Sequence, residues 1–421
     1  MSFIHVFRVF KKKKSHVLEL DSGYNVKPYF DRYGYMVLFG SFVANLIIEG
    51  CFVSFGIIYN VLVEEFNVTR ASAAWVGSVF QAIPFIFGPV SSIITNKFGC
   101  RRAAIIGGFI ACLGWFLGSF MNSIALLVIT FGLISGFGLS LVVIPSLVIV
   151  PFYFVERMSL AASIAIGGSG LGTIIYPPMT DYLIRTYTWR GAFQILAASF
   201  LHLVVCGALF RLPDSFGMGL VQTAFDLSIL KNTVFTLFCI QSVFYYFAFD
   251  TPLMNIIALT QQCGVSSQKA SWVLSTYGIA NSFGQMFIGW LADLELFNNL
   301  FIYNFTTVVA GAATVLVAFG TTYTHFILYA ITFGVFISSN YALCTAIIVE
   351  YVGMESLSNA FGITSLAEGT AILLGPPCGG YLFDLNGNYI LTFTCAGLII
   401  MLSGTVLLFV PCFNKCFNKN K

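Results

Sequence analysis

The feature that most constrains the fold of this chain is a series of long apolar stretches. An α-helix of about 20 residues crosses the roughly 30 Å hydrocarbon core of a bilayer and satisfies its own backbone hydrogen bonds there. We place twelve such stretches at 35–63, 73–95, 103–121, 124–150, 158–184, 191–211, 233–260, 270–292, 299–319, 324–349, 357–383 and 389–411. Because 58% of the residues are hydrophobic and only 9% are charged, water cannot be the main solvent. The sequence predicts an all-α membrane protein with twelve transmembrane helices.

The basic residues test this count independently, because cytoplasmic loops collect Lys and Arg. With both termini inside, the predicted cytoplasmic side holds Arg8, Lys11, Lys12, Lys13, Lys14, Lys27, Arg32, Lys97, Arg101, Arg102, Arg157, Arg211, Lys231, Lys415, Lys419 and Lys421. The predicted outer side holds only Arg70, Arg185, Arg190 and Lys269. No basic residue lies at the middle of a predicted helix. The pattern therefore predicts a multi-pass protein with both termini in the cytoplasm.

A polar interruption between the sixth and seventh stretches divides the chain. We expect a cytoplasmic N-terminal segment at 1–34, a six-helix bundle at 35–211, a cytoplasmic linker at 212–232, a second six-helix bundle at 233–411 and a cytoplasmic tail at 412–421. The run from Lys11 to Lys14 is interpreted as an orientation signal or a contact with anionic lipid rather than a nucleic-acid site. The lipid bilayer is therefore an expected partner and nucleic acid is not.

The two bundles are predicted to be pseudo-repeats. GGSGLGTIIYPPMTDYL from Gly167 aligns with LAEGTAILLGPPCGGYL from Leu366. The alignment pairs Gly170 with Gly369, Pro177 with Pro376, Pro178 with Pro377 and Tyr182 with Tyr381. The alternative is that Gly and Pro are simply frequent in transmembrane helices, but their fixed offsets favour a shared plan. Glycine permits close approach of helices and proline bends a helix, so we predict that these residues pack helices together or act as hinges. The predicted residues are Gly168, Gly170, Gly172, Pro177, Pro178, Gly369, Pro376 and Pro377.

Several motifs carry a resemblance to a known family. YFVERMSLAASIAIGGSGLG from Tyr153 resembles the second signature of monocarboxylate transporters, a branch of the major facilitator superfamily. Met158 stands where that family has a second arginine, and of its first signature only Tyr33, Gly34 and Tyr35 match. Further similar segments are WRGA from Trp189, FDLSILKN from Phe225 and NAFGITSLAEGTAILLGPP from Asn359. The resemblance implies the superfamily fold, transport by alternating access and a plasma-membrane location.

The resemblance also implies a cytoplasmic gate. NKFGCRR from Asn96 resembles the superfamily loop between the second and third helices, although Asn96 replaces its usual aspartate. In related transporters this loop and its counterpart between helices eight and nine close the cytoplasmic face, and Asp293 marks the counterpart here. Arg101 and Arg102 are thus expected to gate, to set topology, or both. We also expect Arg157 to pair across the halves with an acid near the end of the tenth helix, the nearest in kind being Glu350 and Glu355.

The sequence departs from proton-coupled relatives at their intramembrane charges. Those transporters carry a lysine in helix one and an aspartate and an arginine in helix eight, which correspond here to Val53, Asn281 and Gln285. Asn281 and Gln285 lie one helical turn apart, so their amides can face one site and bind a polar solute. The alternative is an interhelical hydrogen bond with no part in transport.

Three acids lie inside the predicted helices, namely Glu49, Asp250 and Glu368. A carboxylate at the centre of a helix costs about 2.5 to 3.5 kcal/mol on insertion, so a role in substrate or proton binding is the default hypothesis. The structural alternative is a protonated acid that is hydrogen-bonded to a neighbouring helix. Glu49 precedes Val53 by one turn and is the best substitute for the missing lysine if a proton is coupled.

Three functions stay open on these residues. The first is secondary transport of monocarboxylates or related organic acids, with or without a proton, as the resemblance implies. The second is facilitative transport of zwitterionic, amine-bearing or neutral solutes, with Glu49 or Asp250 meeting a positive group. The third is a sensor or accessory membrane protein that does not transport. A small-molecule solute is the expected partner in the first two, and the sequence leaves an accessory single-span protein open.

No enzyme chemistry is predicted. The sequence contains no recognisable nucleophile and base pair, phosphate-binding glycine loop or metal cluster, so no cofactor and no metal is expected. The glycines from Gly168 to Gly172 follow no strand and are interpreted as packing residues. Asn67 heads a glycosylation sequon on the predicted outer side, and the sequence leaves its use open.

Overall fold

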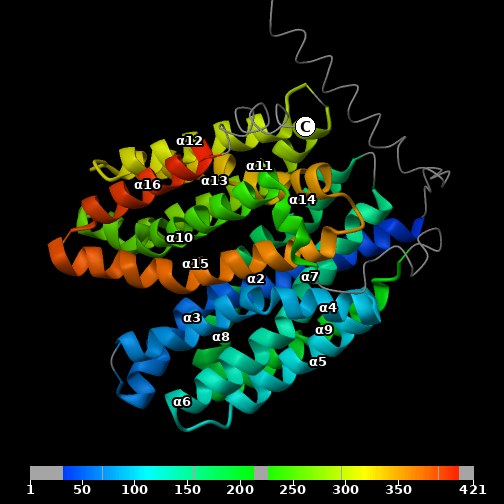
Figure 1. The fold of residues 1–421 in the computed structure, drawn as a ribbon. Coiled ribbons are helices and arrows are strands. Elements are labelled where there is room, and N and C mark those ends of the chain that lie inside the picture. Colours follow the sequence, from blue (N-terminus) through cyan, green and yellow to red (C-terminus); the bar gives the residue numbers. More distant parts are fainter. Residues whose placement is uncertain are drawn as a thin grey trace, which may run out of the picture.

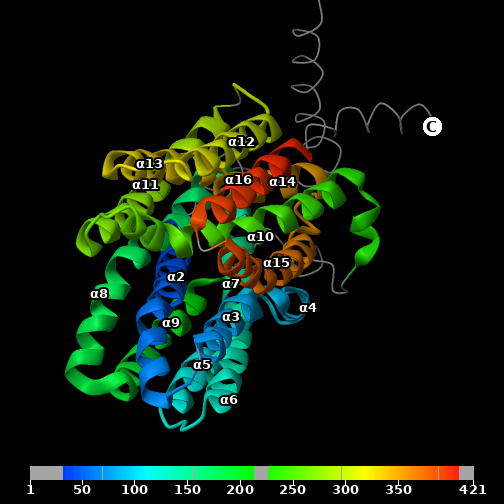
Figure 2. The same ribbon diagram turned by 90° about the vertical axis from the view of Figure 1, so that its left-hand side faces the viewer.

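The fold was obtained as a computed structural model, which describes residues 32–68, 70–154, 157–212, 226–294, 296–386 and 388–406. Most of the predicted N-terminal segment and linker, the whole predicted tail, the sequon residue Thr69 and the side chain of Pro377 lie outside this description. Within it the chain is helical and contains no strand. The helices form two groups, which Figure 2 shows one above the other.

The first group contains α2 (Arg32–Phe66), α3 (Arg70–Ile86), α4 (Gly88–Phe98), α5 (Cys100–Gly118), α6 (Ile124–Leu127), the π-helix η1 (Val128–Ile134), α7 (Ser135–Tyr153), α8 (Met158–Ser199) and α9 (Leu201–Leu209). After the short 3₁₀ helix η2 (Leu227–Lys231), the second group contains α10 (Thr233–Gln262), α11 (Ser267–Asp293), α12 (Asn299–Val317), α13 (Tyr323–Ile337), α14 (Ser339–Val352), α15 (Leu357–Asn386) and α16 (Tyr389–Val406). The order follows the predicted spans, with breaks inside several of them.

One break divides the predicted second span. Helices α3 and α4 meet at Phe87 with a bend of 44°. Pro84 lies inside α3 and Pro89 opens α4, and proline cannot supply the backbone donor that would continue a helix. At the other end of α4, Gly99 adopts a φ of 83°, which glycine reaches without steric penalty, and α5 starts at the next residue.

A second break reverses the chain within the segment assigned to α8. Thr188 has φ 64° and ψ 171°, outside the helical region, between the predicted fifth and sixth spans. Figure 2 shows α8 running to one end of the molecule before the chain returns toward α9. Trp189 is buried against Phe66 and Phe193, and Arg190 donates to Asn122 at 2.7 Å and lies over the Trp189 ring. The WRGA segment therefore anchors this reversal.

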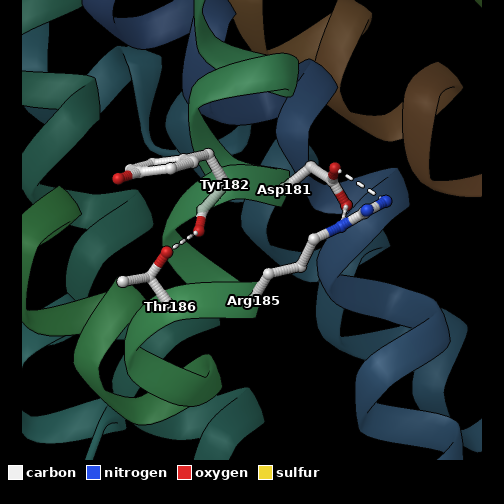
Figure 3. Close-up of polar contacts among 4 residues, drawn as sticks. All are labelled: Asp181, Tyr182, Arg185 and Thr186. Carbon is white, nitrogen blue, oxygen red and sulfur yellow. Dashed lines mark hydrogen bonds and ion pairs between the residues drawn. The ribbon is translucent and has the colours of Figure 1, made fainter.

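Just before the reversal, the exposed face of α8 carries a local ion pair. Arg185 Nε donates to Asp181 Oδ1 at 3.1 Å, and a terminal guanidinium nitrogen lies 3.0 Å from Asp181 Oδ2. Figure 3 shows these two side chains reaching toward one another while Tyr182 points away from them, and it shows the Thr186 hydroxyl bonded to the Tyr182 carbonyl. Exposed pairs one helical turn apart contribute only about 0.3 to 0.5 kcal/mol. This pair supports the last turns of the helix rather than a site.

Nine helices in the described residues are long and apolar enough to cross a membrane, or ten if the bent pair α3 and α4 counts as one span. One of the nine, Met158–Leu209, has 52 residues and contains the reversal at Thr188. Helix α11 falls outside this set although it packs among the spans. The predicted number of twelve is consistent with this arrangement.

Each group has its own interior. In the first group, Trp115 and Phe131 are fully buried and pack with ring centroids 4.8 Å apart, and Phe80 lies 4.4 Å from Phe131. The second group instead buries a polar chain, in which Asn340 donates to Tyr303 Oη at 2.7 Å and Tyr303 donates to Gln241 Oε1 at 2.9 Å. A further buried apolar cluster crosses between the groups, in which Ile144, Val148 and Phe152 of α7 pack with residues of α10, α14 and α15.

Candidate functional site

The first contact between the two groups joins the end of α11 to the beginning of α8. Asp293 Oδ1 accepts a hydrogen bond from the backbone N–H of Ser159 at 3.2 Å, and Oδ2 accepts one from Leu160 at 2.9 Å. The first N–H groups of a helix have no partner inside it, and the helix dipole favours a negative charge there. Asp293 therefore caps a helix of the other group. One turn earlier, Gly289 lies so close to Ser159 and Ser163 that a side chain would not fit.

The second contact joins α4 to the beginning of α15. Asn96 Nδ2 donates to Asn359 Oδ1 at 3.1 Å, and Ser92 Oγ donates to the same oxygen at 3.2 Å. The hydroxyls of Ser92 and Ser358 are 3.1 Å apart. The predicted counterparts Asn96 and Asp293 thus occupy comparable places, but Asn96 meets a side chain and Asp293 meets backbone N–H groups.

Small residues extend each contact toward the middle of the molecule. Beside α8, Gly170 packs directly on Ser282 of α11, and Gly278 faces Thr173. Beside α15, a Cβ on Gly369 would lie 2.6 Å from the Ile86 nitrogen and 2.9 Å from the Ala82 oxygen of α3. We call these two strips the α8–α11 seam and the α15–α3/α4 seam. Gly170 and Gly369, which the sequence alignment pairs, lie in equivalent positions of the two seams.

The other predicted packing residues lie within their own group. Gly168 and Gly172 pack on the backbone of α2, at Phe42 and Leu46 respectively. Pro177 is half-buried, Pro178 is exposed and Pro376 is half-buried, and helices α8 and α15 continue through them. The seams and these internal contacts together explain the glycine content of α8.

The other charged residues that were predicted to gate take no part in the two contacts described above. Arg101 and Arg102 are exposed in the first turn of α5. Arg157 is exposed immediately before α8, and in the part of the chain described it forms no ion pair with Glu350 or Glu355. The N–H groups that follow Arg157 in α8, those of Ser159 and Leu160, are bonded to Asp293. The pairing of Arg157 with one of these acids stays a prediction.

Two of the three intramembrane acids interact across the groups, and the third shares a neighbouring tyrosine with them. Glu49 of α2 and Asp250 of α10 lie close enough for their charges to interact, and both keep partial exposure at mid-helix. Tyr341 of α14 lies within electrostatic reach of Glu49, Asp250 and also Glu368 of α15. Glu368 is only 8% exposed. We call this set of three acids, together with Tyr277 and Tyr341, the central site.

The two predicted amides extend from the central site along α11. Tyr277 lies within electrostatic reach of Glu49 and Asp250, and its hydroxyl accepts a hydrogen bond from Asn281 Nδ2 at 3.3 Å. Gln285 Nε2 donates to Asn281 Oδ1 at 2.6 Å. This series of hydrogen bonds ends at Gln285, which is 1% exposed and whose Oε1 has no hydrogen-bond partner. That oxygen faces α8 at Gly167.

Several contributors were not singled out from the sequence. Ser92 and Ser358 are buried serines without any distinguishing pattern, and tyrosine is common in this chain, so Tyr277 and Tyr341 gave no signal. Asn359 opens a family-like segment, which could have drawn attention to it. Among the described residues no group of three or more His, Cys, Asp or Glu side chains could hold a metal ion. What the arrangement offers is carboxylates, amide oxygens and phenol rings between two helix groups.

Comparison with known sequences agrees with this architecture. The family model of the Major Facilitator Superfamily matches residues 37–255 and 238–413. Mouse monocarboxylate transporter 2 is 29% identical over 372 residues, covering 82% of this chain and 77% of that protein. Rat monocarboxylate transporter 13 is 29% identical over 389 residues, covering 92% and 91%. The resemblance to monocarboxylate transporters that the motifs indicated is thereby confirmed over most of the chain.

Solved structures show the same fold. The human organic anion transporter MFSD10 superimposes with a TM-score of 0.68 at 14% identity, covering 89% of this chain and 99% of that one. The Major Facilitator Superfamily transporter FucP in the outward conformation gives a TM-score of 0.65 at 16% identity, covering 91% of this chain and 99% of that one. Two helix groups, two glycine-lined seams and a matching family model over nearly the whole sequence lead to one conclusion: the chain belongs to the Major Facilitator Superfamily.

Proposed function

We propose that this protein is a secondary transporter of small organic solutes that works by alternating access, and that the structure represents its outward-facing state. The observation that carries the proposal is the closure of one end by the two seams. The basic-residue pattern assigns that end to the cytoplasm, because Lys97, Arg101 and Arg102 follow the Asn96 contact. In Figure 1 the two groups lie close near α4, α7 and α14 and spread toward the ends of α6 and α16.

The seams suit a rocking motion. Small residues let two helices slide and separate without large side chains interlocking. At the closed end, polar contacts lie beside an apolar cluster that Val148 and Phe152 of α7 share with α14 and α15. The Asp293 and Asn96 contacts can be exchanged for water when the cytoplasmic end opens. Neither the seams nor the central site needs residues from a second chain. We propose the plasma membrane as the location, with both termini cytoplasmic. Epitope tags at the termini that antibodies reach only after permeabilisation would support this orientation.

A reversible cross-link tests alternating access directly. The Ser92 and Ser358 hydroxyls are 3.1 Å apart, so the Ser92→Cys/Ser358→Cys pair is close enough for a disulfide that holds the cytoplasmic end closed. In a background without the native cysteines, oxidation should abolish uptake into proteoliposomes and reduction should restore it. The Ser92→Cys single variant is the matched control and should be insensitive to oxidant. Full transport by the cross-linked pair contradicts the proposal.

The solutes to test follow from the two substrate classes that the sequence left open. The panel contains lactate, pyruvate, amino acids, creatine-like and carnitine-like compounds, each with and without an inward proton gradient. We propose transport without an obligatory proton, because Val53, Asn281 and Gln285 replace the charged residues of proton-coupled relatives and none of them titrates. Accumulation driven by the gradient and lost in Glu49→Gln, with exchange preserved, would instead assign the proton to Glu49. Uptake of no solute at all would favour a sensor.

A further inference from the structure

The contacts along the α8–α11 seam follow a regular register. On α11 the contacting residues are spaced four apart, and so are their partners on α8. From the cytoplasmic end inward, the contacts are Asp293 with Ser159, Gly289 with Ser163, and Gln285 with Gly167. Residues four apart form one ridge along a helix. The register therefore places the side chain of Gln285 between the two helix groups, about two turns inside the Asp293 cap.

The amide of Gln285 is satisfied on one side only. Its Nε2 donates to Asn281 Oδ1 at 2.6 Å within α11. Its Oε1 accepts no hydrogen bond from a described residue, although the side chain is only 1% exposed. A Cβ added to Gly167 would have Met286 Cε at 3.3 Å and Gln285 Oε1 at 4.0 Å as its nearest neighbours. The oxygen thus faces a residue of α8 that has no side chain to donate to it.

The equivalent place in the α15–α3/α4 seam has a different residue. Asn96 and Asp293 are counterparts in the two seams. Eight residues before them stand Gly88 and Gln285, respectively. Gly88 packs directly on Ser365 of α15, so that seam is filled there by close helix contact. The buried amide is therefore a feature of one seam and not of the repeat.

An unpaired buried acceptor destabilises the state in which it is buried, because water would donate to it elsewhere. When the cytoplasmic end opens, α8 and α11 separate and water reaches the Gln285 oxygen. The unpaired oxygen thus disfavours the closed seam, whereas the Asp293 cap favours it. Building on the proposed alternating access, we propose that Gln285 is a positioning residue that offsets the Asp293 cap. The closed cytoplasmic end then opens with a smaller input of free energy.

The test supplies the missing donor. Gly167→Ser places a hydroxyl beside Gln285 Oε1, and Gly167→Ala is the matched control with the same Cβ and no hydroxyl. The flexible end of Met286 can move aside equally for both. Relative to Gly167→Ala, Gly167→Ser should raise the ratio of outward-facing to inward-facing protein about fivefold, because the new hydrogen bond forms in the closed seam. Spin labels at Tyr182 and Tyr381, exposed residues of opposite groups, measure this ratio in a cysteine-free background.

Gln285→Met shows whether the effect passes through the amide. In this background the serine hydroxyl has no oxygen to donate to, so Gly167→Ser and Gly167→Ala should give equal ratios. Asn281 Oδ1 loses its donor in Gln285→Met, but it does so in both members of the comparison. Equal ratios for the two Gly167 variants with Gln285 present overturn the inference. A fivefold difference that persists in Gln285→Met overturns it as well.

Gln285→Glu gives a second readout, which a residue that only packs would not change. An ionised carboxylate costs more to bury than an amide, so the inward-facing fraction should rise as the pH increases and the side chain ionises. A fraction with the same pH dependence as the wild-type protein overturns the inference. These measurements need no transported solute, so their failure leaves the transport function standing. Full uptake by the cross-linked Ser92→Cys/Ser358→Cys pair removes alternating access itself, and this inference with it.

Discussion

The two seams occupy equivalent places in the internal repeat, yet different chemistry closes them. At the α8–α11 seam, the carboxylate of Asp293 accepts two backbone hydrogen bonds at a helix N-terminus. At the α15–α3/α4 seam, Asn96 and Ser92 share the side-chain oxygen of Asn359. A charged acceptor on a helix dipole is stronger than a neutral amide contact, because hydrogen bonds to ionised groups are roughly twice as strong. Equivalent geometry therefore does not imply equal contributions to closure.

The largest expected effect comes from Asp293→Ala. The substitution leaves the N–H groups of Ser159 and Leu160 without their partner and removes the charge from the helix end. We expect the free energy that favours the closed cytoplasmic end to fall by about 2 kcal/mol. This change shifts the ratio of outward-facing to inward-facing protein roughly 30-fold toward the inward-facing state. Spin labels at Tyr182 and Tyr381, exposed residues of opposite groups, would report the change in a cysteine-free background. An unchanged distance distribution would remove Asp293 from the gate.

The paired glycines give the second comparison. A Cβ on Gly369 meets the backbone of Ile86 and Ala82, which cannot move aside, whereas a Cβ on Gly170 meets the hydroxyl of Ser282. Gly369→Ala should therefore destabilise the closed seam by about 1 to 3 kcal/mol, and Gly170→Ala by less. The spin-label distances measure both. Adding Ser282→Gly should rescue Gly170→Ala, because it removes both the Oγ and the Cβ of Ser282. A Gly170→Ala effect as large as that of Gly369→Ala would contradict this assignment.

Asn96→Ala should have a smaller effect than Asp293→Ala. Asn359 Oδ1 keeps the hydrogen bond from Ser92 when Asn96 is removed, so no acceptor is left unsatisfied. We expect a loss of about 0.5 to 1.5 kcal/mol in closure. A double-mutant cycle with Asn359→Ala, read by the same distance measurement, should give a positive coupling energy. Additive effects of the two substitutions would show that the Asn96 contact does not contribute.

The smallest expected effect is a gain from Asn96→Asp, which makes the two seams alike. A carboxylate next to the N-terminus of α15 should stabilise closure by about 0.3 to 1 kcal/mol, and the Asn359 amide can turn to donate to it. The outward-facing fraction should rise about twofold. A shift toward the inward-facing state would mean that the neutral amide is required at this position and that the asymmetry of the seams is functional.

The repeat could be predicted because it depends on residues that few others can replace. Gly170 and Gly369 share a register in the sequence, and the structure places both where no Cβ fits well. The glycine alignment predicted packing roles in α8 and α15, and the structure shows that both helices meet the opposite group. The partner of Arg157 was predicted from charge alone and stays a prediction. The backbone N–H groups that Asp293 meets have no signature in a sequence, since every residue but proline has one.

Sequence alone determined the environment of the chain, its helical class and its division into two related halves, because apolar length, loop charge and repeated glycines are local properties. It also indicated that Glu49, Asp250 and Glu368 are unusual, because carboxylates are costly in a membrane. Only the tertiary structure decided that Glu49 and Asp250 lie within electrostatic reach across the two halves, that Gln285 ends in an unpaired oxygen, and that Asp293 contacts α8 at the α8–α11 seam. These are contacts between distant segments, and they follow from how the helices pack rather than from any segment by itself.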